Sequence, residues 1–582
     1  MEPAGGMAPF AAGPGVVIRR VRVRRRPAAT PLPGLDPVAA RVLAARGCSR
    51  PPDYALASML PPTLADLEAA ARLLVDAIEQ GRRILVVGDF DADGATGTAV
   101  AVRGLRGLGA ADVCWRMPDR IRHGYGLSTK LAEECLALEP DVLVTVDHGI
   151  SSIEGVARMR DAGVRVVVTD HHLPGPTLPA ADVIVNPNRS DDDFPSPHLA
   201  GCGVLFYVLI GVRAELRRRG HTAEFRLDSL LDLVALGTVA DLVRLDENNR
   251  RLVRQGLDRI RRRRCTAGVA ALLEVAGRNL AHVAAGDLGF IAGPRLNAAG
   301  RLDDISIGIR CLLTDDADEA MRLAGELDRF NRDRQQLQSE MVETAQQLAA
   351  ELAAGIEGEP GGLCLYDADW HPGVVGLVAS RICEQLQRPV IAFAPAEPGA
   401  SELKGSCRSP ASVHMRDLLA VLDARHRGLI DRFGGHARAA GLSLDNARFD
   451  DFRKAFDAHV AALEFPPDAV LSDGSLAPAE LTIATAEALT EAGPWGQGWD
   501  EPLFDGHFRV LERRVVGKDH LKMLLEPFGG GPALDAIAFR AGDWCHRDLP
   551  EPLHVTYRLE LNRWRGRVTP QLNIQHWVEG EG

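Results

Sequence analysis

From about residue 62 the chain alternates helical stretches with short apolar runs that are rich in β-branched residues. The runs are Ile84–Val87, Val113–Trp115, Val142–Val146, Val164–Val168 and Val183–Val185. This alternation predicts βαβ units and a parallel sheet. Because ligands of such sheets bind beyond the carboxyl ends of the strands, we expect a functional crevice there.

Two further regions follow along the chain. Residues 205–290 read as mainly helical, and residues 312–355 carry a long pattern of Ala, Leu, Gln, Glu and Arg with few breakers, which predicts a connecting helix. After a glycine pair, the runs Gly362–Tyr366 and Pro389–Ala394 flank a predicted helix near 375–387. This pattern indicates a second α/β domain.

The last region changes character again. From about residue 505 the β-like runs are short and interrupted, as in Phe508–Val516 and His554–Leu561, and they predict a small β-barrel. The fold class is therefore α/β with a C-terminal barrel. We expect an N-terminal extension, partly disordered, at 1–60, a parallel-sheet domain at 61–310, a connecting helix at 311–358, a second α/β domain at 359–466, and a barrel with its linker at 467–582.

The composition is that of several ordinary globular domains. A chain of 582 residues exceeds the usual limit of about 250–300 residues for one core. Apolar residues make up 46% of the chain and charged residues 25%, and no segment resembles a signal sequence or a membrane span. The ten cysteines are scattered without a CxxC pair, which argues against a zinc ribbon or a disulfide framework and fits a reducing cytosol.

The net charge of the chain does not by itself identify its binding partner. The net charge of −12 disfavours nonspecific adhesion to nucleic acid, although a local basic groove inside an acidic shell is compatible with it. A group of arginines near the N-terminus could contact phosphates, or it could belong to a solvated extension or an edge strand, which is the interpretation we favour. These residues are Arg19, Arg20, Arg22, Arg24, Arg25 and Arg26.

Three carboxylates stand in one short loop directly after the first predicted strand, as Asp89-Phe90-Asp91-Ala92-Asp93-Gly94. Without a cation they would repel one another, so such a cluster indicates a metal site. The spacing also matches the start of an EF-hand loop. That interpretation fails because Val100 stands where the bidentate glutamate is needed and because a strand precedes the loop rather than a helix.

Acids and imidazoles follow other predicted strands in the same way. Asp147 stands in Thr145-Val146-Asp147-His148-Gly149, the pair His171 and His172 stands in Thr169-Asp170-His171-His172, and Asp241 ends the apolar segment Leu230–Ala240. Each aspartate alone is more often a helix N-cap than a ligand. Together they would place several uncompensated carboxylates in one crevice, which favours a metal centre.

The ligand types narrow the choice of metal. Mixed carboxylate and imidazole ligation suits Mn²⁺, with Mg²⁺ as the cellular competitor, and Zn²⁺ is disfavoured without thiolates. Two ions sharing Asp147 could activate water and stabilise an in-line displacement at a phosphate.

These elements, in this order, resemble the motifs of the DHH phosphoesterases, whose name comes from the triplet that stands here as Asp170-His171-His172. The motif-bearing span runs from about residue 84 to residue 250 and includes the segment 232–241 and Asn249-Arg250. The resemblance implies metal ligation by Asp91, Asp93, Asp147, His171 and Asp241, with Asp89 and His172 close to the ions or substrate. His148 departs from the Cys or Asn that more often follows the second-motif aspartate. This difference leaves the expected metal ligands unchanged and would affect only the local tuning of the metal site.

The resemblance continues into the RecJ-like exonucleases. Residues 294–302 (Pro-Arg-Leu-Asn-Ala-Ala-Gly-Arg-Leu) look like a segment typical of that family, and residues 369–376 and 434–441 are similar to its DHH-associated domain. The glycine motif Gly434-Gly435-His436 permits two interpretations. It is a tight turn that needs positive φ, or a backbone that approaches a nucleotide or phosphate closely.

RecJ-like enzymes also carry a pocket for the 5′ phosphate of their substrate. Residues 405–409 are similar to that element, so the resemblance implies phosphate binding by Ser406 and Arg408, with Arg120 and Arg301 converging from the catalytic domain. An arginine fork suits a terminal phosphate, although a surface salt bridge is the alternative for Arg120. Asn297, Gly434, Gly435 and His436 complete the expected DNA-binding set.

The C-terminal barrel resembles the OB fold of the same family. OB folds bind single strands through a basic groove and stacked aromatic rings, but aromatic residues make up only 5% of the chain. Trp495 and Trp499 could stack on bases, although we favour interdomain packing for both.

The resemblance implies a metal-dependent 5′→3′ exonuclease that degrades single-stranded DNA in repair and recombination. Its domains would enclose a hole too narrow for duplex DNA, and water activated by the metal would release nucleoside 5′-monophosphates. Single-strand-binding protein and a RecQ-type helicase are implied partners of a cytoplasmic, monomeric enzyme with no membrane association. The alternatives are a phosphodiesterase of small substrates such as nanoRNA, pAp or cyclic dinucleotides, and a non-catalytic DNA-binding scaffold.

Overall fold

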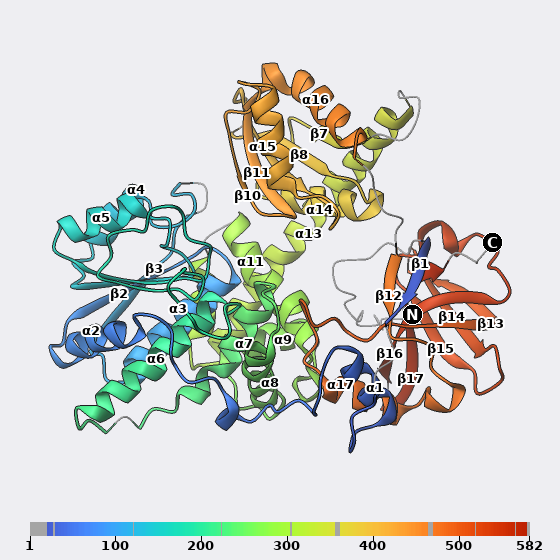
Figure 1. The fold of residues 1–582 in the computed structure, drawn as a ribbon, viewed down its shortest axis with the longest axis horizontal. Helices are drawn as coiled ribbons and strands as arrows, with labels where there is room; N and C mark the ends of the chain where they lie inside the picture. Colours follow the sequence, from blue (N-terminus) through green and yellow to red (C-terminus); the bar gives the residue numbers. More distant parts are fainter. Residues whose placement is uncertain are drawn as a thin grey trace, which may run out of the picture. The chain divides into compact units, whose positions relative to one another are not determined.

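The computed structural model describes residues 20–26, 30–119, 122–222, 224–302, 305–354, 361–397, 399–463, 469–517, 519–564 and 566–578. These residues divide into two compact units (Figure 1). The first unit holds residues up to 331, apart from the first strand, together with residues 482–502. The second unit holds that strand with residues 332–481 and 503–578.

A five-stranded parallel sheet forms the centre of the first unit, as the apolar runs predict. Its strands are β2 (Arg83–Gly88), β3 (Asp112–Arg116), β4 (Val142–Val146), β5 (Arg165–Thr169) and β6 (Val183–Val185), in the order β3-β2-β4-β5-β6. The chain runs from β2 to β3 on one side and then returns to β4 on the other side. The carboxyl ends of β2 and β4 therefore flank a topological switch point, which is where such sheets bind ligands.

Helices cover both faces of this sheet. Ile84 and Val86 face a core shared with α2 (Leu67–Glu79), α3 (Ala92–Gly107) and α6 (Gly201–Arg218). Leu85 and Val87 face the opposite core, shared with α4 (Thr129–Leu136) and α5 (Ile153–Asp161). Because successive side chains of a strand alternate between faces, one continuous apolar run supplies both cores.

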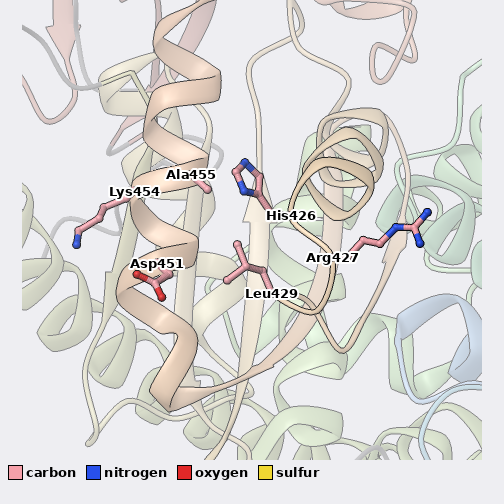
Figure 2. Close-up of a pocket in the computed structure, with 6 residues that line it drawn as sticks. All are labelled: His426, Arg427, Leu429, Asp451, Lys454 and Ala455. Atoms are coloured by element: carbon pink, nitrogen blue, oxygen red, sulfur yellow. The ribbon is translucent and has the colours of Figure 1, made fainter.

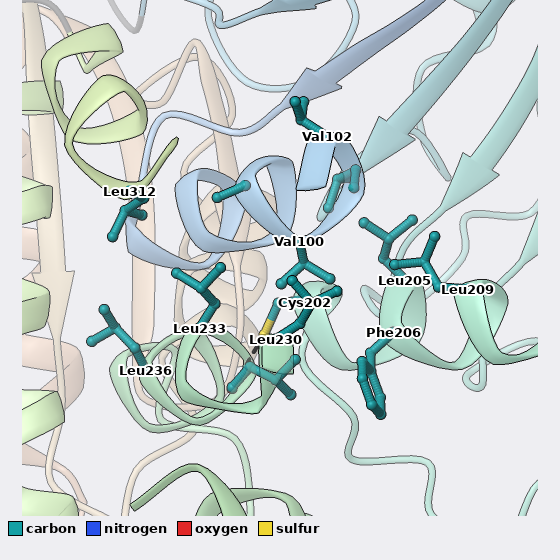
Figure 3. Close-up of a cluster of buried hydrophobic side chains, with 14 of the residues drawn as sticks. Val100, Val102, Cys202, Leu205, Phe206, Leu209, Leu230, Leu233, Leu236 and Leu312 are labelled. Carbon is teal, nitrogen blue, oxygen red and sulfur yellow. Dashed lines mark hydrogen bonds between the residues drawn. The ribbon is translucent and has the colours of Figure 1, made fainter. Parts of the chain in front are cut away.

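A helical layer extends the larger core. It consists of α7 (Leu231–Ala240), α8 (Glu247–Arg261), α9 (Ala267–Glu274), α10 (Ala285–Asp287), the π-helical turn η4 (Leu288–Ala292), α11 (Gly293–Leu302) and α12 (Ser306–Leu313). Figure 3 shows Val100 of α3, Cys202 of α6 and Leu233 of α7 meeting in this core. The mainly helical character expected for residues 205–290 is confirmed.

The predicted connecting helix is confirmed as α13 (Ala317–Ala354), which is 38 residues long. Leu323 and Leu327 in its first part are buried in the core of the first unit. Met341 and Ala345 in its second part are buried in a core of the second unit. One helix thus contributes apolar side chains to both units.

The second α/β domain contains a mixed five-stranded sheet. Its strands are β7 (Leu363–Tyr366), β8 (Val390–Pro395), β9 (Glu402–Arg408), β10 (Arg432–Gly435) and β11 (Ala439–Asp445), in the order β10-β11-β9-β8-β7. Its helices are α14 (Val375–Leu386), α15 (Met415–Arg425) and α16 (Phe449–Ala461). The strands and helix predicted at 362–394 are confirmed within one or two residues.

The C-terminal barrel is also confirmed. Strands β13 (Phe504–Val516), β14 (His520–Pro527), β15 (Leu534–Ala538), β17 (Arg567–Val578) and β16 (Leu553–Trp564) close on themselves, because β16 pairs with both β17 and β13. The arginine-rich strand β1 (Arg20–Arg25) pairs with β12 (Ala469–Ser472) on one side and β17 on the other. The expectation of an extension or edge strand is therefore wrong for Arg20–Arg25, because Arg20 and Val21 pair with β17 and residues 22–25 pair with β12; Arg19 lies outside the described residues. The Arg-Val alternation is a strand pattern.

The segment that precedes the barrel strands packs in the first unit. It contains α17 (Ile483–Ala492), which lies against α1 (Pro37–Ala45), and the Trp495 and Trp499 rings, whose centroids are 6.1 Å apart. The Arg250 guanidinium lies 3.9 Å from the centroid of the Trp499 ring. Packing is therefore the role that the structure gives both tryptophans. Among the helices of the described residues, none has the length and apolar character needed to cross a membrane.

Two helical glycines offer a matched test of this packing. A Cβ at Gly256 of α8 would lie 2.2 Å from the Leu231 carbonyl oxygen, whereas a Cβ at Gly325 of α13 would meet nothing within 4 Å. We expect Gly256→Ala to lower the free energy of unfolding by about 1–3 kcal/mol through overpacking. Gly325→Ala should raise it by about 0.5–1 kcal/mol, because alanine is the better helix former. Calorimetric unfolding measures the sign of both changes in the free energy of unfolding. Equal effects of the two variants would contradict the close α7–α8 packing.

Candidate metal centre

The predicted acids and imidazoles meet at the switch point of the parallel sheet. Asp89 follows β2, Asp147 follows β4, and His171 lies two residues after β5. Asp241 is the C-cap residue of α7. The His171 Nε2 atom lies 2.9 Å from Asp147 Oδ1 and 3.4 Å from Asp241 Oδ2. Strand ends and one helix end therefore supply a single cluster.

The aspartate loop turns tightly from β2 into α3. Asp91 is the N-cap residue of α3, and its Oδ1 accepts hydrogen bonds from the backbone N–H groups of Asp93 and Gly94, at 2.9 and 3.0 Å. Gly94 permits the turn, because a Cβ there would lie 2.3 Å from the Asp89 carbonyl oxygen. The capping role that is common for aspartate thus holds for Asp91, and it fixes the carboxylate beside its two neighbours.

Asp93 is held by a second helix terminus. Its Oδ2 accepts from the Gly201 N–H at 2.6 Å, and its Oδ1 accepts from the Cys202 N–H at 3.1 Å. Both donors belong to the first turn of α6, where backbone N–H groups and the helix dipole favour negative charge. The α6 N-terminus therefore orients this fully buried carboxylate.

Asp147 adopts a backbone conformation that is unusual for a residue with a side chain. Its φ is 66°, in the left-handed region, and its side chain is buried. Gly201 leaves room for it, because a Cβ at that position would lie 2.5 Å from the Asp147 Cβ. Strained conformations of this kind cluster at functional sites.

Asp170 orients the two histidines and is absent from the sets of clustered ligand atoms. Its Oδ1 accepts from the backbone N–H groups of His171 and His172 and lies 2.8 Å from His172 Nδ1, while its Oδ2 accepts from the Ile150 N–H. Burial acts to raise the pKa of Asp170. The hydrogen bonds, led by the one from His172, outweigh burial and hold this pKa at about 2. Asp170 therefore stays ionised and fixes its neighbours.

The remaining carboxylates are poorly compensated. Burial and the neighbouring carboxylates raise the pKa of Asp147 and of Asp241 well above the ordinary value. Burial also raises the pKa of Asp93, whereas burial lowers the pKa of His171 and leaves it neutral. Neutral imidazole and crowded carboxylates are the donors that a divalent cation requires, so the residues present fit a metal centre.

Three overlapping sets of ligand atoms lie close enough for shared ligation. Within each set the atoms are no more than 4.8 Å apart. The sets are Asp89, Asp91 and Asp147; Asp93, His171 and Asp241; and Asp147, His171 and His172. Asp147 and His171 each belong to two sets, which is the arrangement expected of a centre for more than one ion.

Helix α11 supports the aspartate loop from behind. The Asn297 Oδ1 accepts from the Ala92 N–H at 2.7 Å, and a Cβ at Gly300 would lie 2.2 Å from the Phe90 carbonyl oxygen. The sequence assigned Asn297 to DNA binding, and in the structure its amide oxygen holds the metal loop. Arg301 lies in the same helix, and its side chain is outside the described residues, as is all of Arg120.

Tyr125 is a site residue that the sequence analysis missed. Its hydroxyl lies 3.0 Å from His172 Nδ1 and 3.4 Å from the Asp147 carbonyl oxygen. Its ring contacts the rings of Phe90 and His172 edge to face. The only signal in the sequence was an aromatic residue between two glycines, Gly124-Tyr125-Gly126.

Two of the expected phosphate-binding residues, Ser406 and Arg408, lie in the second unit. A Cβ at Gly376, in the first turn of α14, would lie 3.2 Å from Arg408 Nη2 and 3.4 Å from Ser406 Oγ. Both side chains therefore face the start of this helix. The Arg408 Nε donates to Ser380 Oγ at 2.9 Å, which fixes the guanidinium. A cation, a hydroxyl and a helix N-terminus at one point suit an anion.

The glycine motif lies beside these residues on the same sheet. Gly434 pairs with Gly441, and Gly441 pairs with Ser406. Gly435 has a φ of 141°, and a Cβ there would lie 2.4 Å from the Ala440 Cα, whereas a Cβ at Gly434 would meet nothing within 4 Å. Gly435 thus serves the turn. Gly434 leaves bare backbone near Ser406, and His436 beyond it is exposed.

Comparison with known proteins agrees with this architecture. The DHH family N-terminal domain matches residues 83–238, the DHHA1 domain matches residues 345–462, and the RecJ OB domain matches residues 472–576. The single-stranded-DNA-specific exonuclease RecJ of Escherichia coli (strain K12) is 47% identical over 574 residues, which cover 96% of this chain and 99% of that protein.

The chain belongs to the RecJ family.

Solved RecJ structures share its fold. RecJ from Thermus thermophilus in complex with Mn²⁺ matches with a TM-score of 0.78 at 34% identity, covering 97% of this chain and 80% of that one. The complex of the same RecJ with Mg²⁺ matches with a TM-score of 0.73 at 32% identity, covering 97% and 79%. The expected fold class, with a parallel-sheet DHH domain, a second α/β domain and an OB barrel, is thereby confirmed.

A pocket in the DHH-associated domain of this chain lies outside the cluster. It has a volume of about 500 Å³ and is shown in Figure 2. Its lining residues are His426, Arg427, Leu429, Asp451, Lys454 and Ala455. His426 is the C-cap residue of α15, directly after Arg425, whose positive charge in the last turn stabilises the helix dipole.

Metal binding to this chain can be tested without measuring enzyme activity. Adding Mn²⁺ at 100 times its Kd to metal-free protein should raise the Tm of the first unit by roughly 4 °C. Asp147→Asn should abolish this shift and raise the Tm of the metal-free protein, because it removes one repelling charge. Asp112→Asn, at the opposite end of the sheet, is the control and should keep the shift. A full Mn²⁺ shift in Asp147→Asn would contradict the site.

Proposed function

We propose that this chain is a metal-dependent 5′→3′ exonuclease that is specific for single-stranded DNA and releases nucleoside 5′-monophosphates. The observation that carries the proposal is the cluster of carboxylates around His171 at the switch point of the sheet. The near full-length similarity to the exonuclease RecJ of Escherichia coli supports the substrate.

Two Mn²⁺ or Mg²⁺ ions are the proposed cofactors. Asp91, Asp93, Asp147, His171 and Asp241 would hold them, with Asp89 as a further candidate ligand. When bound, such ions lower the pKa of water and neutralise charge that develops on a phosphate. The Mn²⁺ and Mg²⁺ complexes of the related RecJ support this choice of ions.

His172 has a separate role in the proposal. Although burial acts to lower it, hydrogen bonding to Asp170 raises the pKa of His172. With Nδ1 occupied by Asp170 and Tyr125, the Nε2 atom is the one that can hold a proton toward a phosphate oxygen of the strand. Asp170 and Tyr125 fix the plane of the ring, so we treat both as positioning residues.

Degradation in the 5′→3′ direction requires a means of recognising the 5′ end. We assign this to Arg408 and Ser406, which face the first turn of α14, with bare backbone at Gly434 two strands away on the same sheet. A terminal phosphate carries more charge than an internal one, and an arginine with a helix N-terminus would favour it. Gly435, His436, Asn297, Arg120 and Arg301 complete the proposed DNA-binding set.

The proposed setting is DNA repair and recombination in the cytoplasm. Single-strand-binding protein and a RecQ-type helicase are the proposed partners, since an exonuclease of this specificity needs a supply of single strands. We propose a monomer, because the whole metal cluster comes from one chain.

The direct test uses a single-stranded oligodeoxynucleotide labelled at its 3′ end, with Mn²⁺. We expect a ladder that shortens from the free 5′ end, and no products with EDTA or with Asp147→Asn. An otherwise identical substrate whose 5′ end is closed in a hairpin should resist cleavage. Cleavage of a dinucleotide alone would instead favour the phosphodiesterase of small substrates, and binding without cleavage would favour the scaffold.

The 5′-phosphate assignment has its own test. Arg408→Ala should lower kcat/KM on a 5′-phosphorylated strand by about 10- to 100-fold, because a hydrogen bond to a charged group contributes about 1.5–3 kcal/mol. The same variant should have little effect on a 5′-hydroxyl strand. Arg448→Ala, in an exposed ion pair of the same domain, is the control. An equal loss on both strands would contradict recognition of the terminal phosphate.

A further inference from the structure

Two large apolar side chains are exposed next to one of the proposed ligands. Leu242, directly after Asp241, is 57% exposed, and Phe290 in the π-helical turn η4 is 41% exposed. Neither belongs to the apolar core that includes their neighbours Val239 and Leu288. Exposed apolar side chains that gather beside a functional centre mark binding surfaces more often than scattered ones do.

Leu242 and Gly289, the residue directly before Phe290, both approach one carbonyl group. The Leu242 N–H donates to the Val239 carbonyl oxygen at 3.3 Å, and a Cβ at Gly289 would lie 3.4 Å from the same oxygen. A Cβ at Gly293 would lie 2.9 Å from the Ala240 Cβ. The turn that carries Phe290 thus packs against the C-terminus of α7, shortly before Leu242. We call this pair the apolar step.

Both halves of the apolar step use costly backbone conformations. Leu242 has a φ of 59°, in the left-handed region that leucine rarely adopts. Phe290 lies in a π-helical turn, and such turns are rare and concentrate at functional sites. A strained, exposed leucine contributes little to the core, so core packing does not account for its conformation.

We propose that the apolar step binds an unpaired nucleobase of the strand whose phosphate lies at the metal centre. This inference rests on the proposed function and extends it to base contacts. Asp241 places the step within reach of a nucleotide adjoining the scissile phosphate. A base presents an apolar face that any sequence shares, so Phe290 and Leu242 can accept each nucleotide in turn as the strand advances. In a duplex that face is stacked and unavailable.

The test compares a normal strand with one that carries abasic sites near its 5′ end. Phe290→Ala should raise KM for the normal strand about five- to tenfold with kcat changed less than about twofold, as expected for lost base stacking. On the abasic strand the variant and the unaltered enzyme should have the same KM. Phe290→Trp should restore the KM for the normal strand.

Leu242→Asn tests the other half of the step, because asparagine tolerates a left-handed backbone but lacks the apolar surface. It should raise KM on the normal strand without lowering Tm. Leu138→Ala is the control. It removes an exposed leucine of the first unit that lies near the amino ends of the sheet strands, so it should leave KM unchanged. An unchanged KM in Phe290→Ala, or an equal rise on both strands, would overturn the proposal while leaving the exonuclease intact. Absence of any strand degradation by the unaltered enzyme would overturn the proposed function and this inference with it.

Discussion

Mutual repulsion among carboxylates is the interaction around which the first unit is organised. Asp89, Asp91, Asp93, Asp147 and Asp241 occupy one buried or half-buried region, with His171 neutral among them. Two helix N-termini oppose the repulsion, because α3 is capped by Asp91 and α6 donates to Asp93. Asp241 has no such support, since it lies at the C-terminus of α7, where the helix dipole disfavours negative charge. The demand for a cation is therefore greatest on its side of the cluster.

A helix N-terminus also lies next to a charged group in the second unit, but there the group is a cation. There the start of α14 faces Arg408 and Ser406 instead of a buried carboxylate of the chain. In the first unit, helix N-termini satisfy anions that belong to the protein. In the second unit, the helix start, the arginine and the serine place donors for an anion at one point, which is why we assign that place to substrate.

Local sequence predicted most of this fold because its signals are local. The β-branched runs marked all five parallel strands, and the acids directly after them marked the metal centre. What the sequence could not give depends on distant pairings. The hydrogen bond from Ala92 to Asn297 spans 205 residues, and Tyr125 reaches His172 across 47. Strand β1 was misjudged because its pairing partners lie more than 400 residues away, in β12 and β17.

The return of residues 482–502 to the first unit has a consequence for how the protein is made. Leu32 and Leu43 complete a small core with Trp495 and Trp499, and the Leu245 N–H donates to the Gln497 carbonyl oxygen. On the ribosome the N-terminal part emerges first, yet residues 332–481, which belong to the other unit, must be synthesised before this last piece arrives. The first unit therefore stays incomplete, with one apolar face uncovered, while residues 332–481 are made.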